Sequence, residues 1–128
     1  MGKTKFCQGI SDISDSYNAF IIDQWGVLHN GEKAYDGVAD CLRELKRRGK
    51  YLIILSNSGK RAEENKARLD KLGISPSMYD EIVTSGEVTW DGLETQDEGF
   101  FQGLGDKCFL ISRGGDTSIV DGLSNIEL

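Results

Sequence analysis

Three short apolar runs, separated by segments of helical periodicity, form the main pattern of the chain. The runs are continuous rather than alternating, which is typical of strands buried in a parallel sheet, and they cover residues 19–23, 51–55 and 81–84. Between them, apolar positions recur at helical spacing over about 36–48 and 60–72, and each of these segments ends before a glycine. This alternation predicts an α/β fold whose parallel sheet is covered on both faces.

Local signals add three further elements. Asn30-Gly31 is a strong signal for a two-residue hairpin, so we expect a small flap over residues 27–35. Thr84 and Glu87 have the spacing of a capping box, which predicts that a third helix begins there. After an acidic connection, the apolar run 107–111 is expected to form one more strand.

Composition narrows the class of protein. The chain has 128 residues and a net charge of −6, which argues against a nucleic-acid-binding surface. It contains no apolar run of the roughly 20 residues that a membrane helix needs, and no apolar stretch of a secretory signal. Its three cysteines are widely spaced and fit neither a disulfide framework nor a zinc site. We therefore expect a cytoplasmic protein that does not associate with membranes.

The charge also changes along the chain. Residues 1–84 carry 13 basic and 12 acidic side chains, whereas residues 85–128 carry 2 and 9. Together with the weaker periodicity after residue 93, this shift predicts two structural units, 1–93 and 94–128.

Asp23 is the first candidate for chemistry. It ends the first apolar run and precedes a glycine-containing loop, the position at which open α/β sheets place their functional groups. A carboxylate at this position can act as a nucleophile, and an acid that merely caps a turn has the same local sequence. The segment alone leaves both interpretations open.

A polar loop after the second strand is the next candidate. Ser56, Asn57, Ser58 and Gly59 lead directly into a predicted helix, and the amino terminus of a helix attracts anions through its unpaired N–H groups. A serine that simply caps the helix would give the same pattern. Because neighbouring parallel strands end at the same sheet edge, Asp23 and Ser56 are expected to lie close together. A carboxylate beside hydroxyl and amide donors suits phosphoryl transfer through an aspartyl-phosphate.

With these motifs the chain resembles the haloacid dehalogenase superfamily over about residues 15–93. The resemblance rests on the Asp-x-x-Gly-Val-Leu sequence that begins at Asp23, the flap, and the Ser-Asn-Ser-Gly sequence that begins at Ser56. The passage from Gly73 to Glu87 is similar to the class IIA branch, which includes 4-nitrophenyl, phosphoglycolate and pyridoxal phosphatases. The resemblance implies a Rossmann-like three-layer sheet, a partial core in residues 1–93 and the start of an α/β cap in 94–128.

The resemblance also implies roles for individual residues. Asp23 matches the nucleophile, and Ser56 matches the phosphate-binding hydroxyl, with Asn57, Ser58 and Gly59 beside it. Mg²⁺ would be held by Asp23 and by the backbone carbonyl of Trp25, together with acids of a late motif. Phosphatases of the superfamily place a second Asp where Trp25 stands, as general acid and base, and an indole cannot do this work. Within the class IIA branch, the sequence around Trp25 is most similar to uncharacterised hydrolase-like proteins.

Two further features leave alternatives open. His29, the only histidine, is either a substitute acid on the flap or a packing residue. The sequence Gly115-Asp116 to Asp121 has the spacing of an acidic metal motif, which would make the chain a compact enzyme without a cap and with Lys107 as its lysine. In the other interpretations, Lys107 to Leu128 begins the cap domain, or Asp116 is only a turn residue.

The sequence therefore predicts a phosphatase-type hydrolase that acts on a small phosphorylated metabolite and depends on Mg²⁺. Because the late lysine and acidic motifs are absent by resemblance, we expect this chain to be truncated and weakly active or inactive. The alternative is a noncatalytic module that binds phosphate or a partner protein. Exposed apolar surface on an unfinished cap would favour a homo-oligomer.

Overall fold

The computed structural model describes residue 4 and residues 6–128. Its strands and α-helices alternate in the order β1 (Ala19–Asp23), α1 (Val38–Arg47), β2 (Tyr51–Ser56), α2 (Ala62–Lys71), β3 (Glu81–Thr84) and α3 (Ser85–Thr95). Short 3₁₀ helices lie at Ile10–Asp12, Ser14–Ser16, Pro76–Met78, Gly99–Phe101 and Arg113–Gly115. All three predicted strands and all three predicted helices of residues 19–95 are confirmed.

The strands form one parallel sheet in the order β1-β2-β3. The register places Ile22 beside Ile54 and Ile54 beside Ile82, so that one row of isoleucines crosses the sheet. The same register brings the carboxyl ends of the strands to one edge. This open parallel sheet confirms the predicted fold class, a partial Rossmann-like core.

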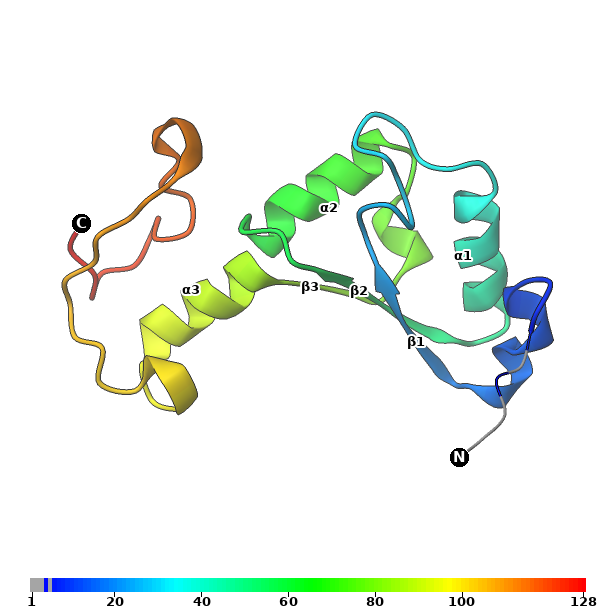
Figure 1. Ribbon diagram of the computed structural model, residues 1–128, viewed down its shortest axis with the longest axis horizontal. Helices are drawn as coiled ribbons and strands as arrows, with labels where there is room; N and C mark the ends of the chain where they lie inside the picture. The colour runs from blue at the N-terminus through cyan, green and yellow to red at the C-terminus, as the bar shows by residue number, and fades with distance from the viewer. Residues whose placement is uncertain (1–3, 5) are drawn as a thin grey trace.

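The hydrophobic core lies between one face of the sheet and the helices α1 and α2. Leu52 and Ile54 of β2 are fully buried, as is Leu69 of α2, and Leu42 and Leu45 of α1 are almost so. These leucines recur at the helical spacing that predicted both helices, so the apolar stripe of each helix is the surface that it buries. In Figure 1 both helices lie above the strands.

The other face of the sheet is bare among the described residues. No α-helix lies beneath β1 and β2 in Figure 1, and two apolar side chains on this side of the strands are exposed. Ile21 is 70% exposed and Leu55 is 48% exposed. We expected helices on both faces, but the described residues place α1 and α2 on one face, while α3 continues away from the sheet after β3 (Figure 1).

This bare face should bind apolar dyes. Parallel sheets are normally buried on both sides, so exposed Ile21 and Leu55 offer apolar surface that water solvates poorly. We expect the wild type to enhance the fluorescence of 8-anilinonaphthalene-1-sulfonate at native pH, and Ile21→Ser to reduce that enhancement. Val88→Ser is the control, because Val88 is 52% exposed but lies on α3. Equal dye fluorescence from the wild type and Ile21→Ser would contradict the expectation.

The flap after β1 is present, but its turn is shifted by one residue. His29 pairs with Ala34 in an isolated antiparallel bridge, and the amide of Asn30 donates to the carbonyl of Lys33 at 3.1 Å. The side-chain oxygen of Asn30 accepts from the amides of Glu32 and Lys33, at 3.0 and 2.9 Å. Gly31 and Glu32 therefore occupy the tip, because the asparagine side chain fixes the turn by local hydrogen bonds.

The strand predicted at 107–111 does not form. Its backbone makes only a bridge at Lys107, which pairs with Glu127, and the amide of Cys108 donates to the carbonyl of Glu127 at 2.7 Å. Phe109 and Ile111 are 91% and 86% exposed. The apolar run does not become a strand because none of the strands in the described residues pairs with it.

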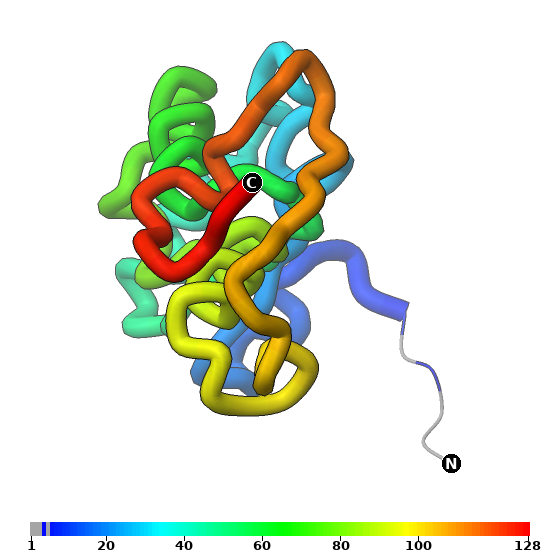
Figure 2. The backbone as a smooth tube through the Cα atoms, turned by 90° about the vertical axis from the view of Figure 1, so that its left-hand side faces the viewer, coloured from blue at the N-terminus to red at the C-terminus, as the bar shows by residue number. Residues whose placement is uncertain are grey.

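The residues after α3 lie at the opposite end of the molecule from α1 (Figure 1). Viewed from that end, residues 106–128 form an irregular loop that folds back in front of the core (Figure 2). None of the described helices is both long and apolar enough to cross a membrane.

Candidate functional site

A cavity of about 460 Å³ opens where the three strands end. Asp23 is the last residue of β1, Ser56 is the last residue of β2, and Asn57 follows it. All three line this cavity, together with Ile21, Leu55 and Ser85. The parallel arrangement of the strands thus brings the predicted nucleophile and the predicted phosphate-binding hydroxyl to one place.

The two principal side chains of this cavity differ in burial. Asp23 is exposed, and its Oδ1 accepts a hydrogen bond from the amide of Gln24 at 2.8 Å. Ser56 is only 3% exposed, and its Oγ accepts from the amide of Ser58 at 3.3 Å. The carboxylate can therefore reach a ligand in solvent, whereas the serine hydroxyl is held in place by the loop that follows it.

The loop of residues 56–60, called the phosphate loop below, is held by hydrogen bonds to α2. The Oγ of Ser58 accepts from the amide of Lys60 at 3.2 Å and from the side-chain amide of Asn65 at 3.3 Å. Asn65 is buried and also donates to the carbonyls of Lys60 and Arg61. Ser58 thus shapes the loop itself and does not cap α2, whose N-cap residue is Arg61.

The start of α3 holds the same loop from another side. The amide of Gly86 donates to the carbonyl of Ser58 at 3.0 Å, and Oγ1 of Thr84 donates to the carbonyl of Lys60 at 2.8 Å. A methyl group on Gly86 would lie 2.3 Å from the carbonyl oxygen of Gly59. Only glycine permits this approach, so the first turn of α3 fixes the loop that carries Ser56 and Asn57.

The amino terminus of α2 is already occupied by a carboxylate of the chain. Glu87 accepts from the amide of Ala62 at 2.7 Å and from the guanidinium of Arg61 at 2.8 and 2.7 Å. These bonds, those of Arg61 first, lower the pKa of Glu87 to about 2. The sequence left open whether this terminus binds an anion or is capped by a serine. Instead, the amide of Ala62 is satisfied by Glu87, and the predicted capping box is half formed, with Thr84 accepting from the amide of Glu87 at 3.0 Å.

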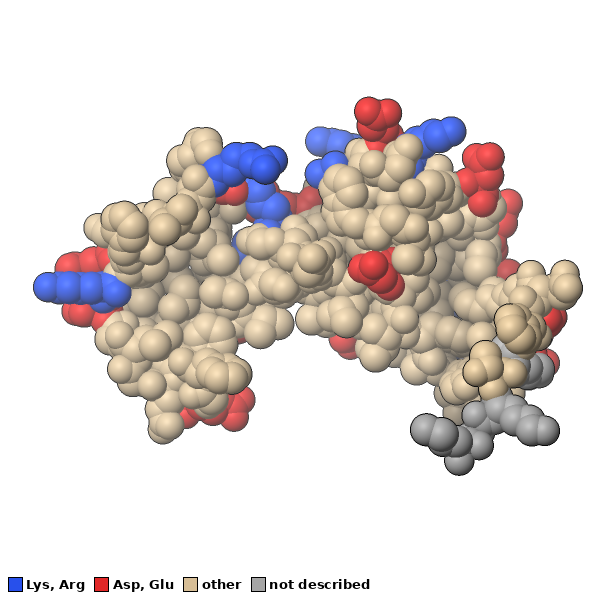
Figure 3. All heavy atoms as spheres, viewed as in Figure 1, with Lys and Arg blue, Asp and Glu red and all other residues tan. Residues whose placement is uncertain are grey.

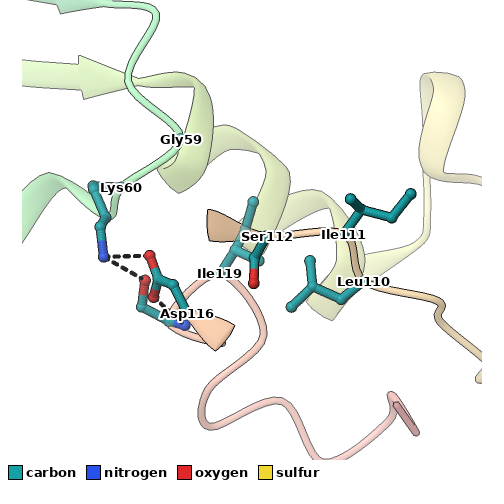
Figure 4. Close-up of a pocket in the computed structure, with 8 residues that line it drawn as sticks. Gly59, Lys60, Leu110, Ile111, Ser112, Asp116 and Ile119 are labelled. Carbon is teal, nitrogen blue, oxygen red and sulfur yellow. Dashed lines mark hydrogen bonds and ion pairs between the residues drawn. The ribbon is translucent and has the colours of Figure 1, made fainter. Parts of the chain in front are cut away.

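Lys60 is paired as well. Its ammonium forms ion pairs with Asp116 and with Glu64, the latter at 3.1 Å, and its hydrogen bond to Asp116 is the main reason that the pKa of this acid is lowered to about 2. Figure 4 shows Lys60 and Asp116 in direct contact at a cavity of about 300 Å³, which both residues line together with residues of the segment 110–119. Asp116 therefore binds the loop lysine, and Asp121 accepts from the hydroxyl of Thr117 at 2.9 Å.

The predicted site residues are thus divided among three cavities. Asp23, Ser56 and Asn57 share the one at the strand ends. Gly59 lines the cavity of Figure 4, and Ser58 lines a third one with Trp25. Ser85 was not recognised from the sequence, although it directly follows the third strand, at the same sheet edge.

Trp25 anchors the flap. Its ring lies edge-on to His29, with centroids 4.8 Å apart, and the guanidinium of Arg68 lies 4.6 Å from its centroid. His29 is fully buried, its Nδ1 accepts from the amide of Gly31 at 2.9 Å, and its pKa is lowered by burial and then by the charge of Arg68. This placement favours the packing role for His29. Trp90 also packs, beneath Arg61, and donates to the carbonyl of Asp121 at 2.9 Å.

The oxygen ligands for Mg²⁺ are few. No group of three or more histidine, cysteine or acidic side chains in the described part of the chain is placed to hold a metal ion. Asp23 offers an exposed carboxylate at the cavity, and Mg²⁺ commonly uses one or two carboxylates with waters and substrate phosphate as the other ligands. The donor set is thus compatible with Mg²⁺ bound by Asp23 and a carbonyl, but not with an all-protein site.

The sheet and the strand-end cavity define an open α/β core with polar side chains at its carboxyl edge. The sequence profile described as haloacid dehalogenase-like hydrolase matches residues 20–124. The chain therefore belongs to the haloacid dehalogenase-like hydrolase family.

Individual relatives include phosphatases. The chain is 31% identical over 72 residues to phosphoglycolate phosphatase 2 of Arabidopsis thaliana. The matched residues cover 56% of this chain and 24% of that protein. A haloacid dehalogenase-like hydrolase of Brucella suis matches 97% of this chain and 44% of its own, with 32% identity and a TM-score of 0.79. The 4-nitrophenylphosphatase of Thermotoga maritima matches 63% of this chain and 31% of its own, with 28% identity and a TM-score of 0.54. The chain spans less than half the length of each.

Proposed function

We propose that the strand-end cavity is a phosphoryl-transfer site for a small phosphorylated metabolite and that Asp23 is its nucleophile. The observation that carries the proposal is the convergence of exposed Asp23 with Ser56 and Asn57 on one cavity at the carboxyl edge of the sheet. The phosphatases among the relatives support the reaction type. Residues 94–128 would form the beginning of a cap domain. The protein would belong to the class IIA branch of its family, with Trp25 in place of an acid, and would be located in the cytoplasm.

In this mechanism an oxygen of Asp23 attacks phosphorus, and the bond from phosphorus to the leaving oxygen breaks. Ser56 and Asn57 would donate hydrogen bonds to the phosphoryl oxygens. Mg²⁺ bound at Asp23 and the carbonyl of Trp25 would neutralise phosphate charge. Water would then hydrolyse the aspartyl-phosphate and restore the carboxylate.

Proton transfer is the weak step. Apart from Asp23, the side chains that line the cavity are Ile21, Leu55, Ser56, Asn57 and Ser85, and none of them titrates near neutral pH. Trp25 has no acidic or basic group and holds the flap instead. Loss of a positioned acid or base costs on the order of 10²- to 10⁴-fold in rate, so slow turnover is expected of this chain.

Binding of beryllofluoride, a phosphoryl analogue, tests the proposal without requiring turnover. Calorimetry on the wild type with Mg²⁺ should show saturable binding, and removal of Mg²⁺ should abolish it. Asp23→Asn should weaken the binding by roughly 30-fold or more, because it removes the charged oxygen that the analogue and the metal share.

Asp36→Asn is the matched control, since Asp36 is also exposed but lies in the turn before α1. It should bind the analogue as the wild type does. Absence of binding at millimolar Mg²⁺, or equal binding by Asp23→Asn, would contradict the catalytic function. Either result would favour the alternative, a noncatalytic module that binds phosphate or a partner protein.

A further inference from the structure

A basic groove lies between the flap and α2, apart from the strand-end cavity. It has a volume of about 430 Å³ and is lined by Trp25, Ser58, Lys60, Glu64, Asn65, Ala67, Arg68 and Lys71. Three of these side chains are cations and one is a carboxylate, so the groove has a formal charge of +2 in a chain whose net charge is −6. This contrast marks the groove as unlike the rest of the surface.

Two of the three cations form no ion pair with any described residue. Lys60 is bound by Glu64 and Asp116, whereas Arg68 and Lys71 have no carboxylate within ion-pair distance in the described part of the chain. Most other basic side chains of α1 and α2 are paired, including Lys66, which binds Glu63 at 3.3 Å. Figure 3 shows basic and acidic groups interspersed along the upper edge of the molecule, over α2 and the flap.

Arg68 is held in position before any ligand arrives. Its guanidinium packs on the ring of Trp25, and one nitrogen donates to the carbonyl of Gly31 at 3.1 Å. A guanidinium has five N–H donors, so most of them remain for a ligand. Because Trp25 and Gly31 fix the side chain, an anion that binds there does not bear the whole entropic cost of ordering it.

We propose that this groove binds the dianionic phosphate group of a small molecule through Arg68 and Lys71. The guanidinium would bind two phosphate oxygens and the ammonium of Lys71 a third, in line with the geometry that these groups favour. The groove is larger than a phosphate ion, which leaves room for an organic part beside Trp25. This site is separate from Asp23, and the proposal does not depend on the function assigned above.

The groove also contacts the phosphate loop. Ser58 lines the groove and directly follows Asn57, which lines the strand-end cavity. A ligand in the groove would therefore contact the loop that carries Ser56, without entering the cavity that holds Asp23.

Inorganic phosphate in the absence of Mg²⁺ is the probe. The chain has two tryptophans, so Trp90→Phe leaves Trp25 as the single indole fluorophore, placed in the groove. In this background phosphate should change the emission of Trp25 saturably, with chloride at equal ionic strength having no such effect. Calorimetry should give the same dissociation constant. Ser85→Ala should leave that constant unchanged, because Ser85 lines the strand-end cavity and not the groove, and this separates the two sites.

Lys71→Gln should weaken phosphate binding by about fivefold, and Arg68→Gln by about tenfold or more, because each removes a charge-assisted contact. Lys71 makes no hydrogen bond within the described part of the chain, so its replacement should not affect folding. Lys66→Gln is the matched control on the same helix. An absence of saturable binding, or equal weakening by Lys66→Gln and Lys71→Gln, would overturn the proposal.

Discussion

Replacing Gly86 by alanine is expected to lower the free energy of unfolding by about 3 kcal/mol, because the new methyl group would collide with backbone. Its carbon would lie 2.3 Å from the carbonyl oxygen of Gly59 and 2.6 Å from that of Lys60. Alanine is the better helix former by about 1 kcal/mol, but this gain is smaller than the cost of moving a loop that is itself hydrogen-bonded. Urea unfolding followed by circular dichroism measures the difference.

Gly59→Ala is the control for this comparison. A methyl group on Gly59 meets no atom within 4 Å, and its backbone does not adopt a left-handed conformation. We expect Gly59→Ala to unfold at the urea concentration of the wild type. If Gly86→Ala were as stable as Gly59→Ala, the close approach of α3 to the phosphate loop would be wrong.

Glu87→Gln is expected to cost about 2 kcal/mol of stability at pH 7, because it removes a carboxylate that accepts from both Arg61 and the start of α2. Its pKa is lowered in the folded chain from 4.5 to about 2, mainly by hydrogen bonds from Arg61. A carboxyl group whose pKa is lower in the folded chain than in the unfolded chain stabilises the fold at pH values above its unfolded pKa. This contribution is lost as the pH falls. The difference between wild type and variant should therefore be constant above about pH 5 and shrink between pH 4.5 and 2.

Urea unfolding at several pH values gives this profile. Glu63→Gln is the control, since the side chain of Glu63 is 86% exposed, against 28% for Glu87. It should change stability little at any pH. A difference between wild type and Glu87→Gln that persists unchanged at pH 2 would show that the ionised carboxylate is not the stabilising group.

The local spacing of apolar residues was sufficient to predict the sheet and its helices. The continuous apolar runs of β1, β2 and β3 identify strands of a parallel sheet, and the leucine spacing of α1 identifies the stripe that it buries. The presence of Asp23 and Ser56 at one cavity also follows from sequence, because consecutive parallel strands end at one edge. These features depend on residues that are near each other along the chain or on a general rule of sheet topology.

The failures concern contacts between distant segments. The run at 107–111 has strand composition, but a strand also needs a paired neighbour, which local composition does not report. Likewise, the amino terminus of α2 was one candidate for binding an anion, but Glu87 accepts from its amide at Ala62 and Asp116 pairs with Lys60 only in the folded chain. The same tertiary contacts explain why the amino terminus of α2 offers less to an anion than its sequence suggests.

The ion pair between Lys60 and Asp116 has a thermodynamic consequence. An anion that takes the ammonium of Lys60 must displace Asp116, and Asp116 belongs to the segment that follows α3. Release of this segment from the loop therefore strengthens anion binding at Lys60. By linkage, the bound anion favours release of the segment by the same factor. A bound anion and the carboxyl-terminal segment are therefore reciprocal competitors for the positive charge of Lys60.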